Sequence, residues 1–421
     1  MVKPVRAIAL VAMVSMALAA CGDDGDSAEG DGGKTLIISS DLPLQGASKD
    51  ASVATNNAIK LYLEQIGNKV GDYTIEFKEY DDSTAAKGNW DDAQCTKNAS
   101  EHVQNTDEVA VMGTYNSGCA KIQVPTLNQD PDGPMLMVSH ANTNPGLTKT
   151  WDPGEPDKFF PSGKRSYARV ITTDDYQGAA AAQFAAQDLK VKKCYVLNDN
   201  QTYGQGVAKA FADEAAKQNI QVLGNEPWDS KATDYKALFG KIKAAGADCV
   251  YLGGIYDLNG GQVVKDKVAV LGPNTGIKLI GPDGFTGYPD LLKLKESEGM
   301  YLTFAGLTTQ QLREAGGAGA KLLDAYKAKY GADPATNYAL YGVSAVQVIL
   351  AAIEKSDGTR KGVRDAVFEG DGITIPAADS VLGKEIKIDT QSGDVNAIDI
   401  SVELVKGGAE TFFKAQPVAG Q

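Results

Sequence analysis

Five loops carry the residues whose types and spacing could bind a small ligand, because each loop follows a short strand-like run. The first two loops are rich in hydroxyls and amides, and the last three carry aromatic rings and a carboxylate. They span residues 113–118, 139–146, 199–204, 253–257 and 281–284. Hydroxyl, amide and N–H groups can hold an anion, and a carboxylate such as Asp283 can receive a cation. Carboxyl ends of parallel strands meet at one sheet edge, so we expect these loops to form one small-molecule site.

The sequence contains few residues that could form a metal site, a nucleotide site or a catalytic site. His102 and His140 are its two histidines, which disfavours a histidine-rich metal site or a catalytic triad with a choice of base. No G-x-G-x-x-G motif lies between a predicted strand and helix and no P-loop Gly-Lys-Ser/Thr occurs, so nucleotide binding is disfavoured. Since neither a nucleophile elbow nor a metal cluster can be assembled, we expect no enzyme activity, metal or cofactor. The paired acids Asp81-Asp82 and Asp174-Asp175 are interpreted as solvated caps.

The elements that must position these loops alternate between strand-like and helix-like runs through most of the chain. Its 421 residues suffice for about two to three domains, and the net charge of −13 opposes nonspecific binding to nucleic acid. Alternation of this kind predicts an α/β fold with two doubly wound parallel sheets.

Long helices are expected over 309–330 and 336–354, the first with a buried stripe, and extended segments are expected near the C-terminus. The stripe residues are Leu322, Leu323, Tyr326 and Tyr330.

Residues 1–20 have the layout of a signal peptide, with Lys3 and Arg6 before a short apolar run. The run is too short to span a bilayer comfortably, since a membrane-crossing helix needs about 20 apolar residues. The segment Leu18-Ala19-Ala20-Cys21 resembles a bacterial lipobox, which makes Cys21 the expected lipidated N-terminus. Residues 21–33 would then join that cysteine to the folded part through a flexible acidic tether. The alternative is an uncleaved membrane anchor.

Four further cysteines suit an exported chain, in which disulfides persist. Four cysteines allow three pairings. Cys194 and Cys249 each stand at the start of a strand-like run, and each is the same number of residues from the loop in which its run ends. Neighbouring strands are close enough for a disulfide between facing cysteines. We therefore predict the pairs Cys194–Cys249 and Cys95–Cys119, the alternative being four reduced buried thiols.

A set of short motifs occurs in order from about residue 34 to the C-terminus. They are Tyr80-Asp81-Asp82, Gly113 with Ser117, and the segments 136–143, 199–206, 251–254 and 281–284. In this order they make the chain resemble the leucine/isoleucine/valine-binding family of type I periplasmic binding proteins, the extracytoplasmic receptors of ATP-driven importers. The resemblance implies two lobes joined by three crossings. The expected N-lobe is 34–173 plus 304–384, and the expected C-lobe is 174–303 plus 385–421.

The resemblance also implies which residues hold the anionic end of a ligand. Ser117 falls where the family holds the ligand carboxylate, and Asn142 and Thr143 fall on a segment that adds N–H and hydroxyl donors. Ala141 offers its carbonyl, and His140, where proline is common, is a further candidate. Ser117 and Thr143 also fit helix N-caps, so that alternative stays open.

The remaining implied site residues belong to the part that closes over the ligand. Tyr203 and Tyr256 fall where the C-lobe closes, and Asp283 falls where a carboxylate receives an ammonium group. The loop at Tyr256 is one residue longer than the family pattern, which leaves Ile255 as a competing alignment. The segment Pro282-Asp283-Gly284 is also typical of a turn, so a purely structural role for Asp283 is the alternative.

The leading interpretation is a monomeric receptor, lipid-anchored on the outer face of the bacterial cytoplasmic membrane. It would deliver a small, branched-chain-like amino acid or an amide-type solute to an ABC permease. One alternative is a ligand-sensing lipoprotein module that reports to a signalling partner, and another is a receptor for urea, a short amide or a polyol. Neighbouring genes would separate transport from sensing, and a ligand screen would identify the solute.

Overall fold

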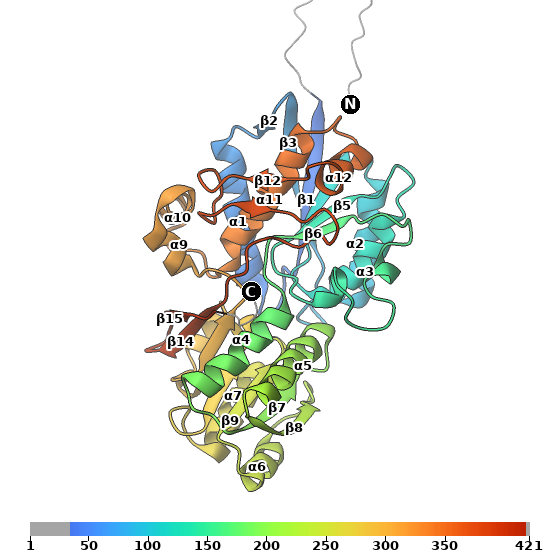
Figure 1. Ribbon diagram of the computed structural model, residues 1–421. Coiled ribbons are helices and arrows are strands. Elements are labelled where there is room, and N and C mark those ends of the chain that lie inside the picture. The colour runs from blue at the N-terminus through green and yellow to red at the C-terminus, as the bar shows by residue number, and fades with distance from the viewer. Residues whose placement is uncertain (1–33, 418–421) are drawn as a thin grey trace, which may run out of the picture. The chain divides into compact units, whose positions relative to one another are not determined.

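The computed structural model describes residues 34–417, which fold around two large sheets and one small one (Figure 1). The predicted signal peptide, Cys21 and the tether up to residue 33 lie outside the described residues. Across the part of the chain that is described, no helix combines the length and apolar character needed to cross a membrane.

The first sheet has six strands in the order β2-β3-β1-β4-β5-β6, and β2 is its antiparallel edge. The other neighbours pair in parallel, as expected when helices connect successive strands. Its strands are β1 (Thr35–Leu42), β2 (Lys69–Val70), β3 (Tyr73–Asp81), β4 (Glu108–Gly113), β5 (Leu136–Ser139) and β6 (Tyr167–Arg169).

The second sheet has seven strands in the order β15-β14-β11-β10-β9-β7-β8. Five strands run in parallel, and the hairpin β14–β15 adds an antiparallel edge next to β11. Its strands are β7 (Lys193–Asn198), β8 (Gln221–Pro227), β9 (Cys249–Gly253), β10 (Lys278–Gly281), β11 (Tyr301–Phe304), β14 (Ser401–Lys406) and β15 (Ala409–Ala415). The small sheet pairs β12 (Thr374–Ile375) with β13 (Ile386–Lys387).

Helices follow most strands, as the alternating pattern predicts. The helices that precede residue 275 are α1 (Lys49–Gln65), α2 (Asp92–Gln104), α3 (Ser117–Asn128), α4 (Asp174–Gln187), α5 (Thr202–Lys217), α6 (Lys236–Ala245) and α7 (Gly260–Leu271). The later ones are α8 (Pro289–Leu292), α9 (Thr309–Ala315), α10 (Gly317–Tyr330), α11 (Tyr338–Glu354) and α12 (Arg360–Phe368). Short 3-10 turns are η1 (Pro145–Leu147), η2 (Asp157–Phe159), η3 (Asp283–Phe285) and η4 (Lys295–Ser297).

Both large sheets carry helices on both faces, because alternate residues of a strand point to opposite sides. In β4, Met112 packs in a core shared with α1 and α11, whereas Val111 packs with α3. In β9, Val250 packs with α6 and α7, whereas Tyr251 packs with α4 and α5. The predicted α/β class with two doubly wound sheets is confirmed.

The expected long helix over 309–330 is instead two helices, α9 and α10. Gly316 separates them, and Gly317 is the first residue of α10; their φ angles of 76° and 75° have the positive sign that glycine adopts without a steric penalty. Of the predicted buried stripe on α10, Tyr326 is buried but Tyr330 is 36% exposed. Tyr330 is the last residue of the helix, where the chain turns away at Gly331.

Three connections run between the two large sheets, near residues 170–174, 304–308 and 396–400. Thr172 contacts the other two connections, since its N–H donates to the Ala305 carbonyl and its hydroxyl donates to the Asp399 carbonyl, both at 3.2 Å. Ile388 and Val395 pack in the core of the first sheet, while β14 joins the second sheet. We therefore propose the two lobes that the resemblance implies, but with the third crossing between them near residue 400 in place of the expected position near residue 385.

Both predicted cysteine pairs lie at disulfide distance. Cys95 of α2 and Cys119 of α3 have Cα atoms 5.6 Å apart. Cys194 and Cys249 lie opposite each other in the pairing of β7 with β9, with Cα atoms 4.4 Å apart. The prediction made from strand spacing is confirmed to that extent.

Candidate functional site

The loops that follow β4, β5, β9 and β10 line one cavity, together with the first turns of α3, α5 and α11. The residues that line it are Tyr115, Asn116, Ser117, Ala141, Tyr203, Ile255, Asp283, Gly284 and Tyr338. Four of them, Ser117, Ala141, Tyr203 and Asp283, are predicted ligand-binding residues. The structure brings these four together, and ligand contact by them stays a prediction.

Asp283 provides a buried carboxylate at one side of the cavity, with an exposed fraction of 1%. The hydroxyl of Tyr203 donates to one carboxylate oxygen, and the hydroxyl of Tyr338 donates to the other at 2.6 Å. Burial raises the pKa of Asp283, and these two hydrogen bonds oppose the rise. Burial also raises the pKa of Tyr203 and Tyr338 well above the usual range, so both hydroxyls stay protonated and donate.

The surroundings of Asp283 are acidic. No Lys, Arg or His is among the described residues that line the cavity. Asp174, expected to be a solvated cap, is instead fully buried, because α4 begins against the cleft. Burial and the neighbouring Asp283 raise the pKa of the Asp174 carboxyl well above its usual range. A positively charged group in the cavity would relieve both effects.

The opposite side of the cavity is the start of α3. Asn116 is the N-cap of this helix, so Ser117 is its first residue and not the cap that the alternative interpretation required. The Ser117 hydroxyl accepts a 3.3 Å hydrogen bond from the N–H of Asn144. A helix N-terminus presents unpaired N–H groups and favours a negative group.

Asn142 and Thr143 do not line the cavity but lie directly behind it. The Asn142 amide donates to the carbonyls of Thr114 and Tyr115 at 2.7 and 3.1 Å, which joins two loops of the site. The Thr143 carbonyl accepts from the N–H of Asp174 at 2.8 Å. Both residues are buried, and their predicted contact with ligand stays a prediction.

His140 is buried behind the aromatic wall of the cavity. Its ring lies 5.8 Å from that of Tyr115 and 5.9 Å from that of Tyr338, measured between centroids. Burial lowers the pKa of His140 to about 3, so the ring is neutral at physiological pH. Within residues 34–417, neither ring nitrogen has a hydrogen-bond partner.

The loop after β9 presents Ile255, not Tyr256, to the cavity. The N–H of Ile255 donates to the Asp199 carboxylate at 2.9 Å, which fixes the start of the loop. The ring of Tyr256 packs 4.9 Å from that of Tyr288 instead. Of the two residues that the sequence left open, Ile255 lines the cavity, and the predicted contact of Tyr256 with ligand stays a prediction.

A group of potential metal ligands lies elsewhere, where Asp82 approaches Cys95 and Cys119. The two cysteines form one of the disulfide pairs, and as a disulfide they offer no thiolate to a metal. Asp82, expected to be solvated, is fully buried here, and burial followed by the charges of Asp41 and Asp81 raises its pKa well above the usual range.

Residues 42–394 match the family described as periplasmic binding protein. The chain belongs to this family. The predicted resemblance is thereby confirmed, over most of the described residues.

Relatives of known sequence and structure agree with this membership. A Pseudomonas aeruginosa relative, the leucine-, isoleucine-, valine-, threonine-, and alanine-binding protein, is 30% identical over 240 residues. That alignment covers 56% of this chain and 58% of the relative, so the chain spans a little over half of that relative's length. A leucine binding protein of Thermotoga maritima shares the fold, with a TM-score of 0.73, 23% identity and coverage of 90% of this chain and 98% of that one. An R. palustris solute binding protein in complex with benzoate has a TM-score of 0.72, 17% identity and coverage of 92% and 98%.

In this periplasmic binding protein, Tyr338 is the lining residue that sequence reasoning missed. It is the first residue of α11, a helix predicted only as core, and its ring contacts that of Tyr115 at 5.3 Å between centroids. Gly284 belongs to a loop that the sequence did single out. A Cβ atom there would lie 2.4 Å from the Gly254 carbonyl oxygen, so the close approach of the two loops requires glycine.

Contacts beside the cavity join elements of the first sheet to elements of the second. Ser48, before α1, donates its N–H and its hydroxyl to the Asp257 carboxylate at 3.0 and 2.9 Å. Tyr288 also donates to this carboxylate, at 2.7 Å. The Asn144 amide donates to the Thr202 carbonyl at 3.2 Å. In this periplasmic binding protein the two sides of the cavity are therefore in direct contact.

Proposed function

We propose that this protein is an extracytoplasmic receptor of an ABC importer and binds a small α-amino acid in the cavity between Ser117 and Asp283. The observation that carries the proposal is the polarity of the cavity. A buried carboxylate stands on one side, and the first turn of α3 stands on the other. An α-amino acid is a zwitterion, and its two charged groups match these two sides.

The ammonium group of the ligand requires the more specific partner, which is Asp283. A buried carboxylate without a cation pays a desolvation cost that an ammonium group at hydrogen-bond distance offsets. Asp283 has two tyrosine donors but no Lys, Arg or His beside it among the described lining residues. Benzoate, the ligand of the R. palustris neighbour, would add a second negative charge next to Asp283. We expect this cavity to bind benzoate poorly.

The apolar part of the cavity lining supports a small aliphatic solute. Ile255 and Tyr115 give the cavity apolar wall for a short aliphatic side chain. The P. aeruginosa relative is named for binding leucine, isoleucine, valine, threonine and alanine, which is consistent with such a solute.

Thermal denaturation with a panel of solutes tests this function. A ligand at 100 times its dissociation constant adds about 2.7 kcal/mol to the free energy of unfolding, which is readily measured. We expect at least one of L-leucine, L-isoleucine, L-valine, L-threonine and L-alanine to raise Tm. The matched control is 4-methylpentanoate, which is leucine without its amino group. Stabilisation by urea, a polyol or benzoate with none from the amino acids would overturn the proposal.

Three further parts of the proposal concern place and partners. We propose export by the signal peptide, attachment through lipidated Cys21, and delivery of the solute by a monomer to a membrane permease. The layout of residues 1–33 supports the first two, and membership of the periplasmic binding protein family supports a receptor role in place of catalysis. Pull-down of the permease with lipidated full-length protein would test the third.

A further inference from the structure

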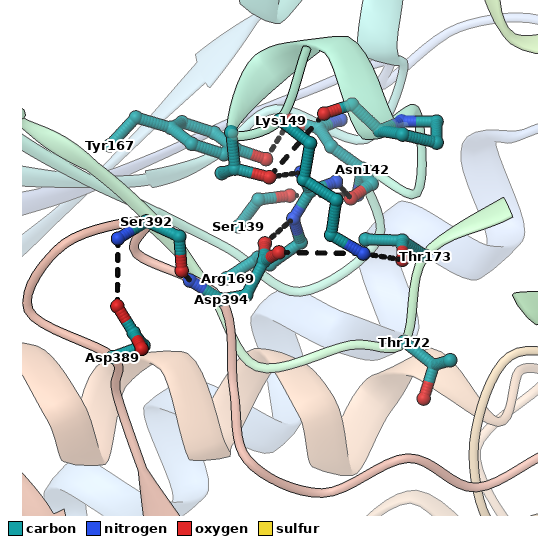
Figure 2. Close-up of polar contacts among 12 residues, drawn as sticks. Ser139, Asn142, Lys149, Tyr167, Arg169, Thr172, Thr173, Asp389, Ser392 and Asp394 are labelled. Atoms are coloured by element: carbon teal, nitrogen blue, oxygen red, sulfur yellow. Dashed lines mark hydrogen bonds and ion pairs between the residues drawn. The ribbon is translucent and has the colours of Figure 1, made fainter. Parts of the chain in front are cut away.

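A buried arginine lies behind the cavity, at the end of β6. Arg169 is fully buried, and its guanidinium is surrounded by acceptors (Figure 2). Its Nη1 donates to the carbonyls of Asn142 and Asn144 at 2.8 and 2.9 Å, and its Nη2 donates to the Thr148 hydroxyl. Three of its hydrogen bonds thus hold one loop, residues 142–148, which we call the cleft loop.

The residues held by Arg169 are themselves in contact with the walls of the cavity. Asn142 donates to the carbonyls of Thr114 and Tyr115, and so fixes the loop that carries Ser117. Asn144 donates its N–H to Ser117 and its amide to the carbonyl of Thr202, next to Tyr203. Both carbonyls that Arg169 holds therefore belong to residues that set the position of lining groups.

The same guanidinium is tied to the last connection between the sheets. Its Nε donates to Asp394 at 2.8 Å, and Asp394 precedes the connection at 396–400. Lys149, which directly follows the cleft loop, lies 3.8 Å from Asp394 and 3.0 Å from both the Thr173 hydroxyl and the Asp175 carboxylate. Figure 2 shows the Arg169 and Lys149 side chains converging on Asp394.

We propose that Arg169 is the positioning residue of the ligand site, held by Asp394 so that the cleft loop keeps Ser117 and the start of α5 in binding geometry. The guanidinium is a planar fork of five donors, so it fixes several acceptors at once, which the single ammonium of a lysine cannot do. The inference rests on the proposed function, because it assigns a role in binding a ligand at that same site.

Arg360 provides a matched control. It is also buried and also donates to several backbone carbonyls, those of His102, Val103, Asn105 and Glu108, as well as to Asp130. Its carbonyl acceptors lie between the end of α2 and the first residue of β4, whereas the cavity follows the other end of that strand. Arg360→Lys therefore removes a similar set of hydrogen bonds away from the cavity.

The first measurement is hydrogen exchange of backbone amides without ligand, in the wild type, Arg169→Lys and Arg360→Lys. Loss of hydrogen bonds to a charged group makes local opening at least about tenfold more frequent. We expect amides of residues 142–149 to exchange at least about tenfold faster in Arg169→Lys alone, with β7 and β9 as internal reference. Unchanged exchange of the cleft loop would overturn the proposal, and this result does not depend on which solute binds.

The second measurement is the Kd for L-leucine by calorimetry, with unfolding by urea recorded for each variant. Arg169→Lys should raise Kd by about tenfold or more, while Arg360→Lys of similar stability leaves Kd unchanged. Equal effects of the two variants on Kd would show a merely structural role. If L-leucine does not bind the wild type, the proposed solute fails but the exchange result still decides the positioning role.

Two milder variants apply if Arg169→Lys does not fold. Asp394→Ala removes the acceptor of Nε, whereas Asp394→Asn keeps an oxygen acceptor without the charge. We expect cleft-loop exchange to rise in Asp394→Ala and to be partly restored in Asp394→Asn. Identical exchange in these two variants and the wild type would show that Asp394 does not hold Arg169.

Discussion

Two buried ionisable residues of this protein have opposite surroundings. Asp283 is a carboxylate without a cationic partner among the described lining residues. His102 is a fully buried ring between two carboxylates, with Nδ1 2.7 Å from Glu108 and Nε2 3.1 Å from Asp41. The charge of Asp283 is left to be matched by a ligand, whereas His102 has both of its partners within the protein. We therefore expect substitution of Asp283 to change ligand binding and substitution of His102 to change stability.

Asp283→Asn should weaken binding of L-leucine more than Ser117→Ala does. Losing one partner of a buried charge pair costs about 2–5 kcal/mol, whereas losing a hydrogen bond to a charged group costs about 1.5–3 kcal/mol. Calorimetry on both variants measures the difference. Wild-type affinity in Asp283→Asn would indicate that Asp283 is only a turn residue or that the solute carries no positive charge.

His102 should make the folded state less stable at high pH. Burial alone would lower the pKa of His102, but hydrogen bonds from its ring to Asp41 and Glu108 raise it to about 9, against 6.5 in an unfolded chain. Its contribution is therefore complete below pH 6.5 and is lost as the pH rises to 9. We expect a decrease on the order of 3 kcal/mol in the free energy of unfolding across this range. Urea denaturation of His102→Gln, which cannot titrate, should show a smaller decrease.

At the scale of elements, the two cysteine pairs join secondary structure in different ways. Cys95–Cys119 links helices α2 and α3 on one face of the first sheet, with a sequence separation of 24 residues. Cys194–Cys249 links adjacent strands β7 and β9, with a separation of 55 residues. Because the entropy that a cross-link removes from the unfolded chain grows with loop length, the two should contribute unequally.

We expect removal of Cys95–Cys119 to cost about 3 kcal/mol and removal of Cys194–Cys249 about 4 kcal/mol. Equilibrium denaturation of the two paired Cys→Ala variants compares these losses. Mass spectrometry of the protein without reductant is the control for each bridge. Detection of four free thiols there would contradict both pairings.

At the scale of the whole molecule, hydrogen bonds join the two sides of the cavity in addition to the three connections. Ser48 with Asp257, Tyr338 with Asp283, and Asn144 with Thr202 are among them. Tyr338 and Asp283 both line the cavity, and the other two hydrogen bonds lie beside it. Water can replace all three when the two sides separate. A ligand that contacts both sides adds to them and favours the closed arrangement.

Saturation with L-leucine should therefore lower the radius of gyration in small-angle scattering. The shift follows from population of the closed form, since a ligand that bridges both sides binds that form better. 4-Methylpentanoate at the same concentration is the control. A radius that stays constant at saturating L-leucine would favour a rigid sensing module over a closing receptor.

Cys21→Ala should release the protein from the membrane without unfolding it. Residue 21 lies outside the described residues, and the fold described here begins at Lys34. Loss of two or more acyl chains removes the anchor, because stable attachment needs more than one chain. Membrane fractionation with thermal denaturation of the soluble fraction measures both parts. Unchanged membrane association would instead indicate an uncleaved anchor.

Several features of the fold could be predicted because they depend on local sequence. The alternation of strand-like and helix-like runs predicted both sheets, and the equal offsets of Cys194 and Cys249 in their strands predicted a pair across β7 and β9. Polar loops at the ends of strands predicted the position of the cavity, including Ser117 and Asp283. A local signal that was overlooked is the glycine pair at 316–317, where the expected helix is divided into α9 and α10.

The sequence by itself thus determined the α/β class, the strand-end loops and the chemistry they offer, since periodicity and residue type decide these locally. Tertiary structure alone decided which side chains meet. Tyr338 reaches the cavity from a helix whose sequence indicates only core, and Arg169 acts on a loop more than twenty residues earlier in the chain, through acceptors that are backbone carbonyls and carry no sequence signal. Asp174 and Asp82 are typical of surface acids in the sequence, but both are buried in the structure. Their burial could not be predicted, because it results from packing between elements and not from the pattern of neighbouring residues.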